Sequence, residues 1–508
     1  MSRNPKNHTG LKAVLILLIL CMIAATAYVI WLCIDITNMD VTVRPSETVT
    51  LTPDSQPTEP TETDPPETTV PEPEKVISTA TIGSMGDILM HMPIFDDYKY
   101  NAAVQQADGT YDFTSVFQYI SEYVTELDYA AANLETTLCG TDNGFAYSGY
   151  PHFNCPDEVV DGAKNAGFDM LLTANNHSYD TTLVGYKRTL EVARGKGMDT
   201  LGTYASADEV KWTVKEINGI NIGMLCYTYA NYATDGRPSL NGNVPISEAG
   251  LCNYFVYENL PAFYTEVETY LAEMEAAGAE ATMMFIHWGV EYNTFANEKQ
   301  EAMAQKLCDL GIDVIVGGHP HVIQPVELLT STVDEDHKTV CLYSMGNAVS
   351  NQRLGNISYI NTAHTEDGIL FSVTFEKYSD GTVYLAGVES LPTWVNMHKN
   401  AAGKTEYNIL PLDYDRVDQW GELYGLDTAV TTAAQNSYRR TMEIVGAGTQ
   451  ESQDYLAQAK IDRDAYYLDL VMNPEKYATE ATETNEATEA ATVPTETAAA
   501  TAAATEAA

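Results

Sequence analysis

The chain has 508 residues, of which 45% are hydrophobic and 19% are charged, so most of it is able to fold around a buried core. Its 27 Lys and Arg residues and 71 Asp and Glu residues give a formal net charge of −44. This charge argues against nucleic acid as a partner, because binding to phosphates requires clustered basic side chains. An acidic surface suits divalent cations, or it simply keeps a protein soluble.

An uncharged apolar run at residues 13–34 predicts a transmembrane helix. At about 1.5 Å per residue, a helix of this length spans the hydrocarbon core of a bilayer, which is roughly 30 Å thick. Basic residues precede the run and acidic residues follow it, so residues 1–12 are predicted to form a cytoplasmic tip. We therefore expect a single-pass protein of the cell membrane whose main domain is extracytoplasmic. Cleavage as a signal peptide is the alternative, but the run is longer than a usual signal-peptide core.

Two stretches of low complexity flank the central part of the chain. Residues 35–75 are rich in Thr, Pro and Glu, and residues 477–508 repeat Ala, Thr and Glu. Neither stretch has enough apolar surface to offset the entropy that is lost when a chain becomes ordered. We predict that both are disordered, and that the first is an extended spacer between the membrane and the main domain.

Residues 76–410 alternate between strand and helix patterns and are predicted to form the main domain. Strands are expected at 76–82, 129–133, 169–173, 281–286 and 313–316, with antiparallel strands at 369–375 and 383–388. Helices are expected at 113–127, at 261–277 and from Asn297 onward. Residues 411–476 are predicted to be a helical extension with helices around 431–445 and 452–470. The pattern indicates an α/β fold in which helices flank mixed β-sheets.

Residues able to bind a metal or to transfer a proton follow successive strands of this domain. They are Asp87, Asn133, Glu135, Asn176, His177, Asp180, His287, Glu291, His319 and His321. The carboxyl ends of strands in open α/β sheets line the ligand crevice, so these side chains are expected to converge. His319 and His321 lie two positions apart, and in an extended segment both imidazoles would face the same way. A mixed set of nitrogen and oxygen ligands suits one or two Mn, Fe or Zn ions.

Six short blocks, taken in order, resemble the CapA family of capsule (poly-γ-glutamate) biosynthesis proteins. The blocks are Gly86-Asp87, Asn133-Leu134-Glu135, Ala174-Asn175-Asn176-His177, His287-Trp288-Gly289, Gly318-His319-Pro320-His321 and Ser344-Met345-Gly346-Asn347. The resemblance covers about residues 77–395. The CapA family is in turn similar to the calcineurin-like metallophosphoesterases. The resemblance therefore implies a layered, metallophosphoesterase-like sandwich with a dinuclear metal site.

The resemblance also implies roles for individual residues. Asp87 and His321 would bind one metal ion, and Glu135 would bridge two ions. The second ion would be held by Asn176, His287 and His319. His177 would protonate a leaving group or stabilise charge in the transition state. Asn133, Asp180, Glu291 and Asn347 would support these ligands or contact the substrate.

One departure from the phosphoesterase pattern weakens the first metal site. Leu89 stands where the Asp-x-His motif has its histidine, and His91 is the nearest substitute.

Residues outside the blocks receive structural interpretations. Arg353 is interpreted as a solvated surface residue, and Cys139 and Cys155 are able to pair if the compartment is oxidising.

The resemblance favours a metal-dependent hydrolase or transferase that acts on an anionic cell-envelope polymer such as poly-γ-glutamate. The alternative is a non-catalytic accessory subunit that works with membrane-embedded synthase or export subunits. A general phosphodiesterase is a third possibility, and it rests on fold-level analogy alone.

Overall fold

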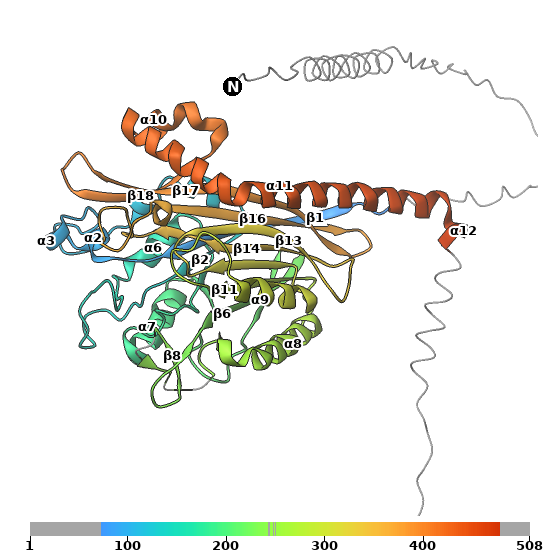
Figure 1. The fold of residues 1–508 in the computed structure, drawn as a ribbon, viewed down its shortest axis with the longest axis horizontal. Coiled ribbons are helices and arrows are strands. Elements are labelled where there is room, and N and C mark those ends of the chain that lie inside the picture. The colour runs from blue at the N-terminus through green and yellow to red at the C-terminus, as the bar shows by residue number, and fades with distance from the viewer. Residues whose placement is uncertain (1–72, 242–243, 247, 249, 478–508) are drawn as a thin grey trace, which may run out of the picture. The chain divides into compact units, whose positions relative to one another are not determined.

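The computed structural model describes residues 73–241, 244–246, 248 and 250–477 (Figure 1). The predicted membrane helix at 13–34, the predicted spacer up to residue 72 and the predicted tail from residue 478 lie outside the described residues. The chain divides into two compact units, 1–69 and 70–508, and the described residues all belong to the second unit. Within the described ranges, no helix has the length and apolar character needed to span a bilayer.

The first sheet has eight strands and joins parallel strands to antiparallel ones. Its order is β18-β17-β16-β1-β2-β3-β4, and β15 pairs with β1. Strands β1 to β4 run parallel, whereas β16, β17 and β18 are antiparallel to their neighbours. The strands are β1 (Val76–Ile88), β2 (Tyr129–Leu134), β3 (Met170–Leu172), β4 (Asp199–Leu201), β15 (Asn347–Val349), β16 (Asp367–Tyr378), β17 (Val383–Lys399) and β18 (Thr405–Pro411).

The second sheet has seven strands in the order β10-β6-β11-β12-β14-β13, with β5 paired to β6. They are β5 (Thr213–Ile217), β6 (Ile220–Tyr229), β10 (Tyr254–Phe255), β11 (Ala281–His287), β12 (Val314–Gly318), β13 (Ile323–Thr330) and β14 (Lys338–Met345). A small third sheet contains β7 (Asn231–Tyr232), β8 (Pro238–Leu240) and β9 (Val244–Pro245).

Helices surround these sheets (Figure 1). The α-helices are α2 (Met92–Phe95), α3 (Asp97–Tyr100), α4 (Thr114–Phe117), α5 (Ser121–Val124), α6 (Glu158–Asn165), α7 (Thr182–Gly195), α8 (Leu260–Ala276), α9 (Glu298–Asp309), α10 (Trp420–Leu423), α11 (Thr428–Met472) and α12 (Pro474–Tyr477). Short 3₁₀ helices are η1 (Tyr257–Asn259), η2 (His364–Glu366) and η3 (Tyr414–Gln419).

The main hydrophobic core lies between the two large sheets. Ile82 and Leu172 of the first sheet belong to the same buried cluster as Ile222 and Phe285 of the second. A second cluster joins the other face of the first sheet to α4 and α6, and a third joins the second sheet to α8 and α9. The predicted α/β fold with mixed sheets and flanking helices is confirmed. This packing matters for the site, because it brings the ends of strands from both sheets together.

Most of the predicted elements are present, and the differences have local causes. The capping box that starts α9 is formed by Asn297 and Gln300, as predicted. The single helix predicted at 113–127 is wrong, because the structure has two short helices, α4 and α5, in this segment. The two helices predicted around 431–445 and 452–470 form one continuous helix, α11. Glycines between them do not end the helix, because its buried side packs on strands β13 and β17 throughout this region.

Close docking of α11 depends on Gly448. A β-carbon at this position would overlap the backbone carbonyl of Val326 in β13, which is not free to move. At Gly446, two residues earlier, the nearest atom to an added β-carbon is Cε of the flexible Met442 side chain, at 3.3 Å. The two glycines therefore offer a matched pair for testing how α11 is held.

We expect Gly448→Ala to lower the free energy of unfolding by about 1–3 kcal/mol, the usual range for overpacking a buried contact. Gly446→Ala is expected to leave it unchanged or to raise it by up to about 1 kcal/mol, because Ala favours the helix. Denaturant unfolding followed by circular dichroism measures both. Equal stabilities for the two variants would mean that α11 does not dock on β13 as described.

The cysteines in the described part of the chain are all free thiols. Cys139 and Cys155 are both buried, and neither is part of a disulfide. The pairing considered from the sequence is therefore absent from the structure. Burial raises the pKa of Cys155 well above its ordinary value, which makes this thiol a poor nucleophile.

Candidate metal centre

Strand ends from both large sheets meet at one buried place. In the first sheet, Asp87 of β1 is in register with Asn133 of β2 and with Asn347 of β15. In the second sheet, His287 at the end of β11 is in register with Gly318 at the end of β12. Since the sheets pack face to face, side chains that are distant in the sequence converge, as expected for the carboxyl ends of parallel strands.

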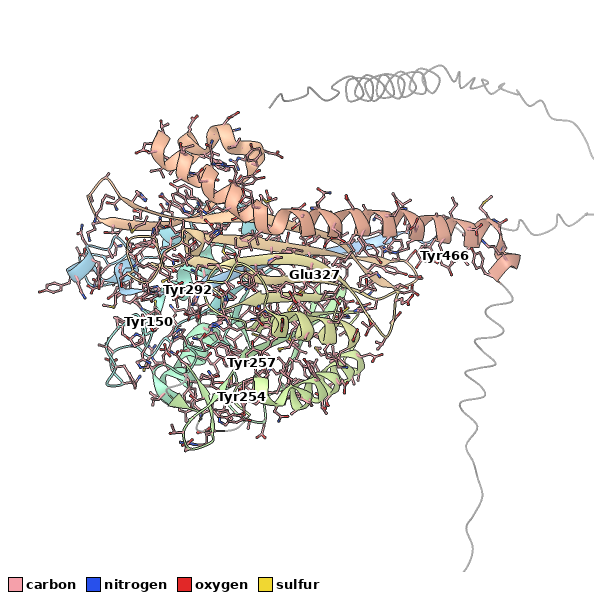
Figure 2. The ribbon with its side chains drawn as sticks, viewed as in Figure 1. Tyr150, Tyr254, Tyr257, Tyr292, Glu327 and Tyr466 are labelled. Carbon is pink, nitrogen blue, oxygen red and sulfur yellow. The ribbon has the colours of Figure 1, made fainter. Side chains whose placement is uncertain are left out.

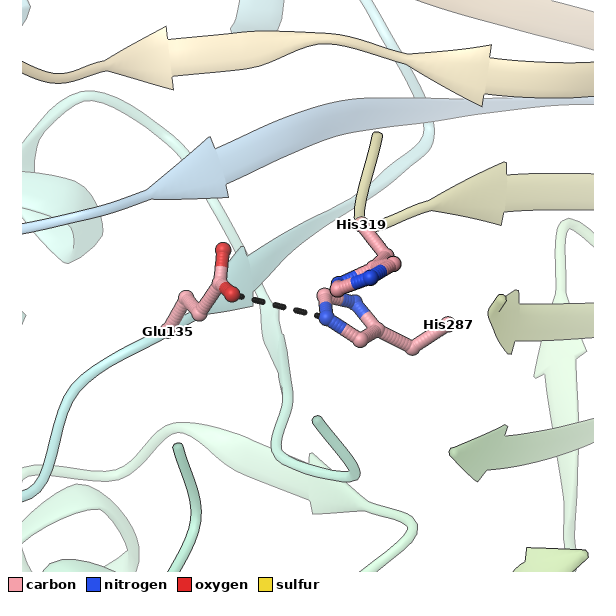
Figure 3. Close-up of side chains that lie close together, drawn as sticks. All are labelled: Glu135, His287 and His319. Atoms are coloured by element: carbon pink, nitrogen blue, oxygen red, sulfur yellow. Dashed lines mark ion pairs between the residues drawn. The ribbon is translucent and has the colours of Figure 1, made fainter. Parts of the chain in front are cut away.

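Two groups of side chains at this place have the composition and spacing of metal ligands. One consists of Glu135, His287 and His319, and the other of Asp87, Glu135 and His321. Within each group the candidate ligand atoms all lie within 4.8 Å of one another. Figure 3 shows the first group, in which Oε1 of Glu135 lies 3.4 Å from Nε2 of His287. Glu135 belongs to both groups, which is the arrangement of a bridging ligand.

The hydrogen bonding of these side chains fits a bound cation. Neither carboxylate oxygen of Glu135 has a hydrogen-bond partner among the described residues, although the side chain is fully buried. Nδ1 of His319 is buried and unpartnered in the same way. A buried polar atom without a hydrogen-bond partner lowers stability, and a divalent ion would provide the missing partner for both side chains. Carboxylate and imidazole ligands together suit Mn, Fe or Zn.

The two carboxyl groups have pKa values shifted in opposite directions. Burial raises the pKa of Glu135 well above its usual range, and the charge of Asp87 raises it further. Burial also opposes ionisation of Asp87, but the hydrogen bond and charge of His321 outweigh burial and lower the pKa of Asp87. Metal binding would therefore have to displace a proton from Glu135, because only the carboxylate form is a ligand.

The three histidines of the ligand groups also have pKa values that are shifted in opposite directions. Burial lowers the pKa of His287 to about 3 and that of His319 well below its ordinary value. Both imidazoles are thus neutral at physiological pH, which is the form that binds metals. Burial also acts on His321, but its hydrogen bond to Asp87 outweighs burial and raises the pKa of His321.

Carboxamide side chains hold the candidate ligands in place. The side-chain amide of Asn133 donates to Oδ1 of Asp87 at 2.7 Å, and Asn175 donates in turn to Oδ1 of Asn133 at 3.1 Å. Oδ1 of Asn347 lies 3.1 Å from Nδ1 of His321. Oδ1 of Asn176 lies 2.7 Å from Nε2 of His287, next to the first group. Such supporting contacts fix the orientation of a ligand and tune the metal that it binds.

His177 lies next to the metal-binding groups but belongs to neither. Its Nδ1 is 2.7 Å from Oδ2 of Asp180, and that same oxygen accepts the backbone N–H of Phe153 at 2.7 Å. Oδ1 of Asn175 accepts the backbone N–H of His177, and the ring of Phe153 packs edge-on against the imidazole. A carboxylate at Nδ1 leaves Nε2 as the nitrogen able to exchange a proton.

The geometry of the His319 and His321 loop differs from the sequence-based expectation. Both residues have positive φ angles, 96° and 56°, so the segment is not extended. The two imidazoles face one centre because the backbone is left-handed at both positions, which is uncommon for residues other than glycine. Strained backbone of this kind persists where the surrounding structure holds it, and it is concentrated at functional sites.

Glu291 and His91, which were also considered from the sequence, lie outside both ligand groups. Glu291 is exposed and influences the centre through its charge, which helps to raise the pKa of His321. His91 is buried with its Nδ1 3.2 Å from the carbonyl oxygen of Leu89, and its ring packs against Phe153. Among the described residues, the group of Asp87, Glu135 and His321 therefore contains no fourth His, Asp, Glu or Cys side chain.

The sequence did not identify two residues that contact the site. Tyr229, at the end of β6, packs against His319 with ring centroids 4.7 Å apart and stacks parallel to His287. The sequence signal that could have identified Tyr229 is its position at the end of a strand in the second sheet. Asn241 follows β8 of the small third sheet, and its side-chain amide lies 3.3 Å from both Asp180 and His177. Nothing in the local sequence places Asn241 there.

Comparison with known proteins identifies a family that matches the segment containing the site. The family described as "Bacterial capsule synthesis protein PGA_cap" matches residues 81–352, a segment that contains every candidate ligand. The "PGA biosynthesis protein CapA" of Bacillus subtilis (strain 168) is 28% identical over 273 residues, which cover 53% of this chain and 62% of the relative. The "Capsule biosynthesis protein CapA" of Bacillus anthracis is 27% identical over 271 residues, which cover 51% and 60%.

These alignments span less than two thirds of the length of either curated relative. The family match nevertheless extends over more than half of this chain and includes the strand ends that form the site. The protein belongs to the bacterial capsule synthesis protein family PGA_cap.

Proposed function

We propose that this protein is a membrane-anchored, extracytoplasmic, metal-dependent hydrolase or transferase that acts on an anionic cell-envelope polymer during capsule biosynthesis. The observation that carries the proposal is the pair of ligand groups sharing Glu135, with His177 beside them. Family membership supports the capsule context. The apolar run at residues 13–34 supports the membrane anchor.

The residues have distinct tasks in this proposal. Asp87 and His321 would hold one ion, His287, His319 and Asn176 the other, and Glu135 would contact both. Ions at this centre would bind an oxyanion of the substrate and lower the pKa of a water molecule. His177 would donate a proton from Nε2 to the leaving group, while Asp180 keeps the imidazole in the required orientation. Asn175 would support both tasks through its contacts with Asn133 and His177.

Poly-γ-glutamate is the proposed polymer, and the names of the relatives support this choice. The net charge of −44 would repel a polyanion at most of the surface. Divalent ions at the centre would provide a local positive charge where a carboxylate could bind. Mn, Fe and Zn all remain candidates, because each accepts imidazole and carboxylate ligands.

A non-catalytic accessory subunit is the second candidate, and a specific feature of the site favours it. Leu89 is buried in the hydrophobic core where the phosphoesterase motif has a histidine ligand. The group of Asp87, Glu135 and His321 therefore lacks a fourth ligand of the kind that Asn176 would add to the other group. A site with one ion could bind a polymer or organise membrane synthase subunits without catalysing a reaction.

The two candidates are separated by incubating the purified full-length protein with poly-γ-glutamate and following the chain length of the polymer. The protein would be stripped with a chelator and reloaded in parallel with Mn, Fe or Zn. A hydrolase is expected to shorten the polymer only after reloading. A protein that binds two ions and the polymer but leaves the chain length unchanged, with or without an acceptor amine, would be an accessory subunit.

A further inference from the structure

Three tyrosines form an aromatic rim next to the metal centre. We define the tyrosine rim as Tyr150, Tyr292 and Tyr359. The ring of Tyr292 lies 6.2 Å from that of His321 and 6.3 Å from that of Tyr359, measured between centroids. Tyr150 and Tyr359 are 67% and 52% exposed, so their rings are accessible from solvent. Tyr150 lies close enough to Tyr359 to influence its pKa, and Tyr150 and Tyr292 are projected near each other in the view of Figure 2.

The electrostatic surroundings of the rim are negative. Burial of Tyr292 is the largest cause of its raised pKa, and the charge of the exposed Glu291 carboxylate is the second. Burial and the neighbouring phenol of Tyr150 raise the pKa of Tyr359, and Glu291 contributes there as well. The phenols of Tyr292 and Tyr359 therefore keep their protons at physiological pH. Their rings keep the negative face that attracts cations.

Among charged side chains, Glu291 has the largest effect on the pKa of Tyr292. Arg353 is the cation nearest in sequence to Tyr359, but it is only 8% exposed and its guanidinium donates to Glu366 at 2.6 Å. Its interpretation as a solvated surface residue is therefore wrong. Burial within the fold and pairing with Glu366 leave Arg353 unable to neutralise an anion at the rim.

We propose that the tyrosine rim and Glu291 bind an organic ammonium group, so that the end of the substrate held at the site is zwitterionic, with an oxyanion at the metal centre and a cation at the rim. This inference rests on the proposed function, because the oxyanion is assigned to the metal centre. Aromatic faces combined with a carboxylate are the typical surroundings of a bound quaternary or primary ammonium group. The ring contacts from His321 through Tyr292 to Tyr359 place the two halves of such a substrate side by side.

Other occupants fit these contacts less well. A purely aliphatic group would remove Glu291 from water without giving it a partner, which is costly. A second anionic group would be repelled by the charge of Glu291. A sugar ring could stack on the tyrosines, and it is therefore the competitor that the experiment must exclude.

The test compares ligands that share a phosphate but differ in the attached group. Phosphocholine, glucose 1-phosphate and inorganic phosphate would be titrated into metal-loaded, full-length protein by isothermal titration calorimetry. We expect phosphocholine to bind about tenfold more tightly than glucose 1-phosphate, since cation–π contacts with several rings add up. For each variant we compare the ratio of the phosphocholine affinity to the inorganic phosphate affinity. A general structural perturbation would change both affinities and leave this ratio nearly constant.

Variants of the rim show whether the aromatic faces carry this preference. Tyr359→Ala is expected to reduce the ratio about fivefold, whereas Tyr359→Phe, which keeps the ring, should change it less than about twofold. Glu291→Gln should also reduce the ratio. Tyr98→Ala is the matched control, because Tyr98 is fully exposed on α3 and belongs to neither site.

Choline chloride separates failure of this inference from failure of the proposed function. One outcome is that choline binds, that this binding disappears in Tyr359→Ala, and that inorganic phosphate does not bind. This outcome would overturn the proposed metal chemistry and with it the zwitterionic substrate. Inorganic phosphate binding without any preference for phosphocholine would overturn the ammonium subsite and leave the metal centre intact. A preference for glucose 1-phosphate would likewise overturn it in favour of a sugar subsite.

Discussion

Glu135→Gln is expected to reduce the metal content of the purified protein from about two ions per chain to nearly none. Among the described residues, Glu135 is the only one shared by both ligand groups, so this single change removes a ligand from each ion. It also removes one of only two carboxylates in these groups, and the remaining charge of Asp87 cannot balance two divalent cations. Elemental analysis of the full-length protein after loading and desalting measures the effect.

The same substitution should act in opposite directions on stability with and without metal. A ligand present at a hundred times its dissociation constant stabilises a fold by about 2.7 kcal/mol, and Glu135→Gln would lose this gain. In the metal-free protein, the pKa of Glu135 is higher in the folded state than in the unfolded state. Its ionisation therefore makes folding less favourable as the pH rises above the unfolded value. Metal-free Glu135→Gln is thus expected to be at least as stable as metal-free wild type at pH 7.

Single-group variants and a control complete this experiment. His319→Ala and His321→Ala should each lose about one ion, because each histidine belongs to one group. His398→Ala should keep both ions, since His398 lies on β17 outside the ligand groups. Two ions retained in Glu135→Gln would show that Glu135 does not bridge them. A wild type that binds one ion would favour the accessory role.

His177→Gln is expected to lower turnover of the polymer by about 10²–10⁴-fold while leaving the metal content unchanged. Glutamine can still hydrogen bond to Asp180, but it cannot donate a proton as an acid does. His177 belongs to neither ligand group but lies close enough to His287 and His319 to lower their pKa values. The substitution is therefore expected to lower turnover without lowering the metal content. Steady-state rates and elemental analysis on the same preparations provide the two measurements.

Two further variants show whether the effect belongs to His177 itself. Asp180→Asn should lower turnover less than His177→Gln does, because it disturbs the orientation of the imidazole and keeps the proton donor. His152→Gln is the matched control, since His152 lies 3.9 Å from Asp180 with a side chain that is 45% exposed. Wild-type turnover in His177→Gln would refute the proton-donor role. Loss of metal in that variant would instead make His177 a ligand.

The sequence by itself determined the chemical types of the candidate ligands and their order along the chain. Strands such as β1, β2 and β11 have strong local patterns, and polar residues at their ends are conspicuous. The carboxyl ends of parallel strands meet at one edge of a sheet, so the proximity of Asp87 and Glu135, at the ends of β1 and β2, follows from the sequence pattern. This reasoning depends only on local patterns and on one general rule of sheet architecture.

Only the tertiary structure decided how these residues meet. The division of the ligands into two groups sharing Glu135 depends on how the two sheets pack, which involves contacts between distant segments. The left-handed backbone at His319 and His321 contradicts the local expectation, because the surrounding loops impose it. Asn241 and the tyrosine rim come from segments without a periodic pattern. Their positions are set by long-range packing, which is not recorded in the neighbouring residues.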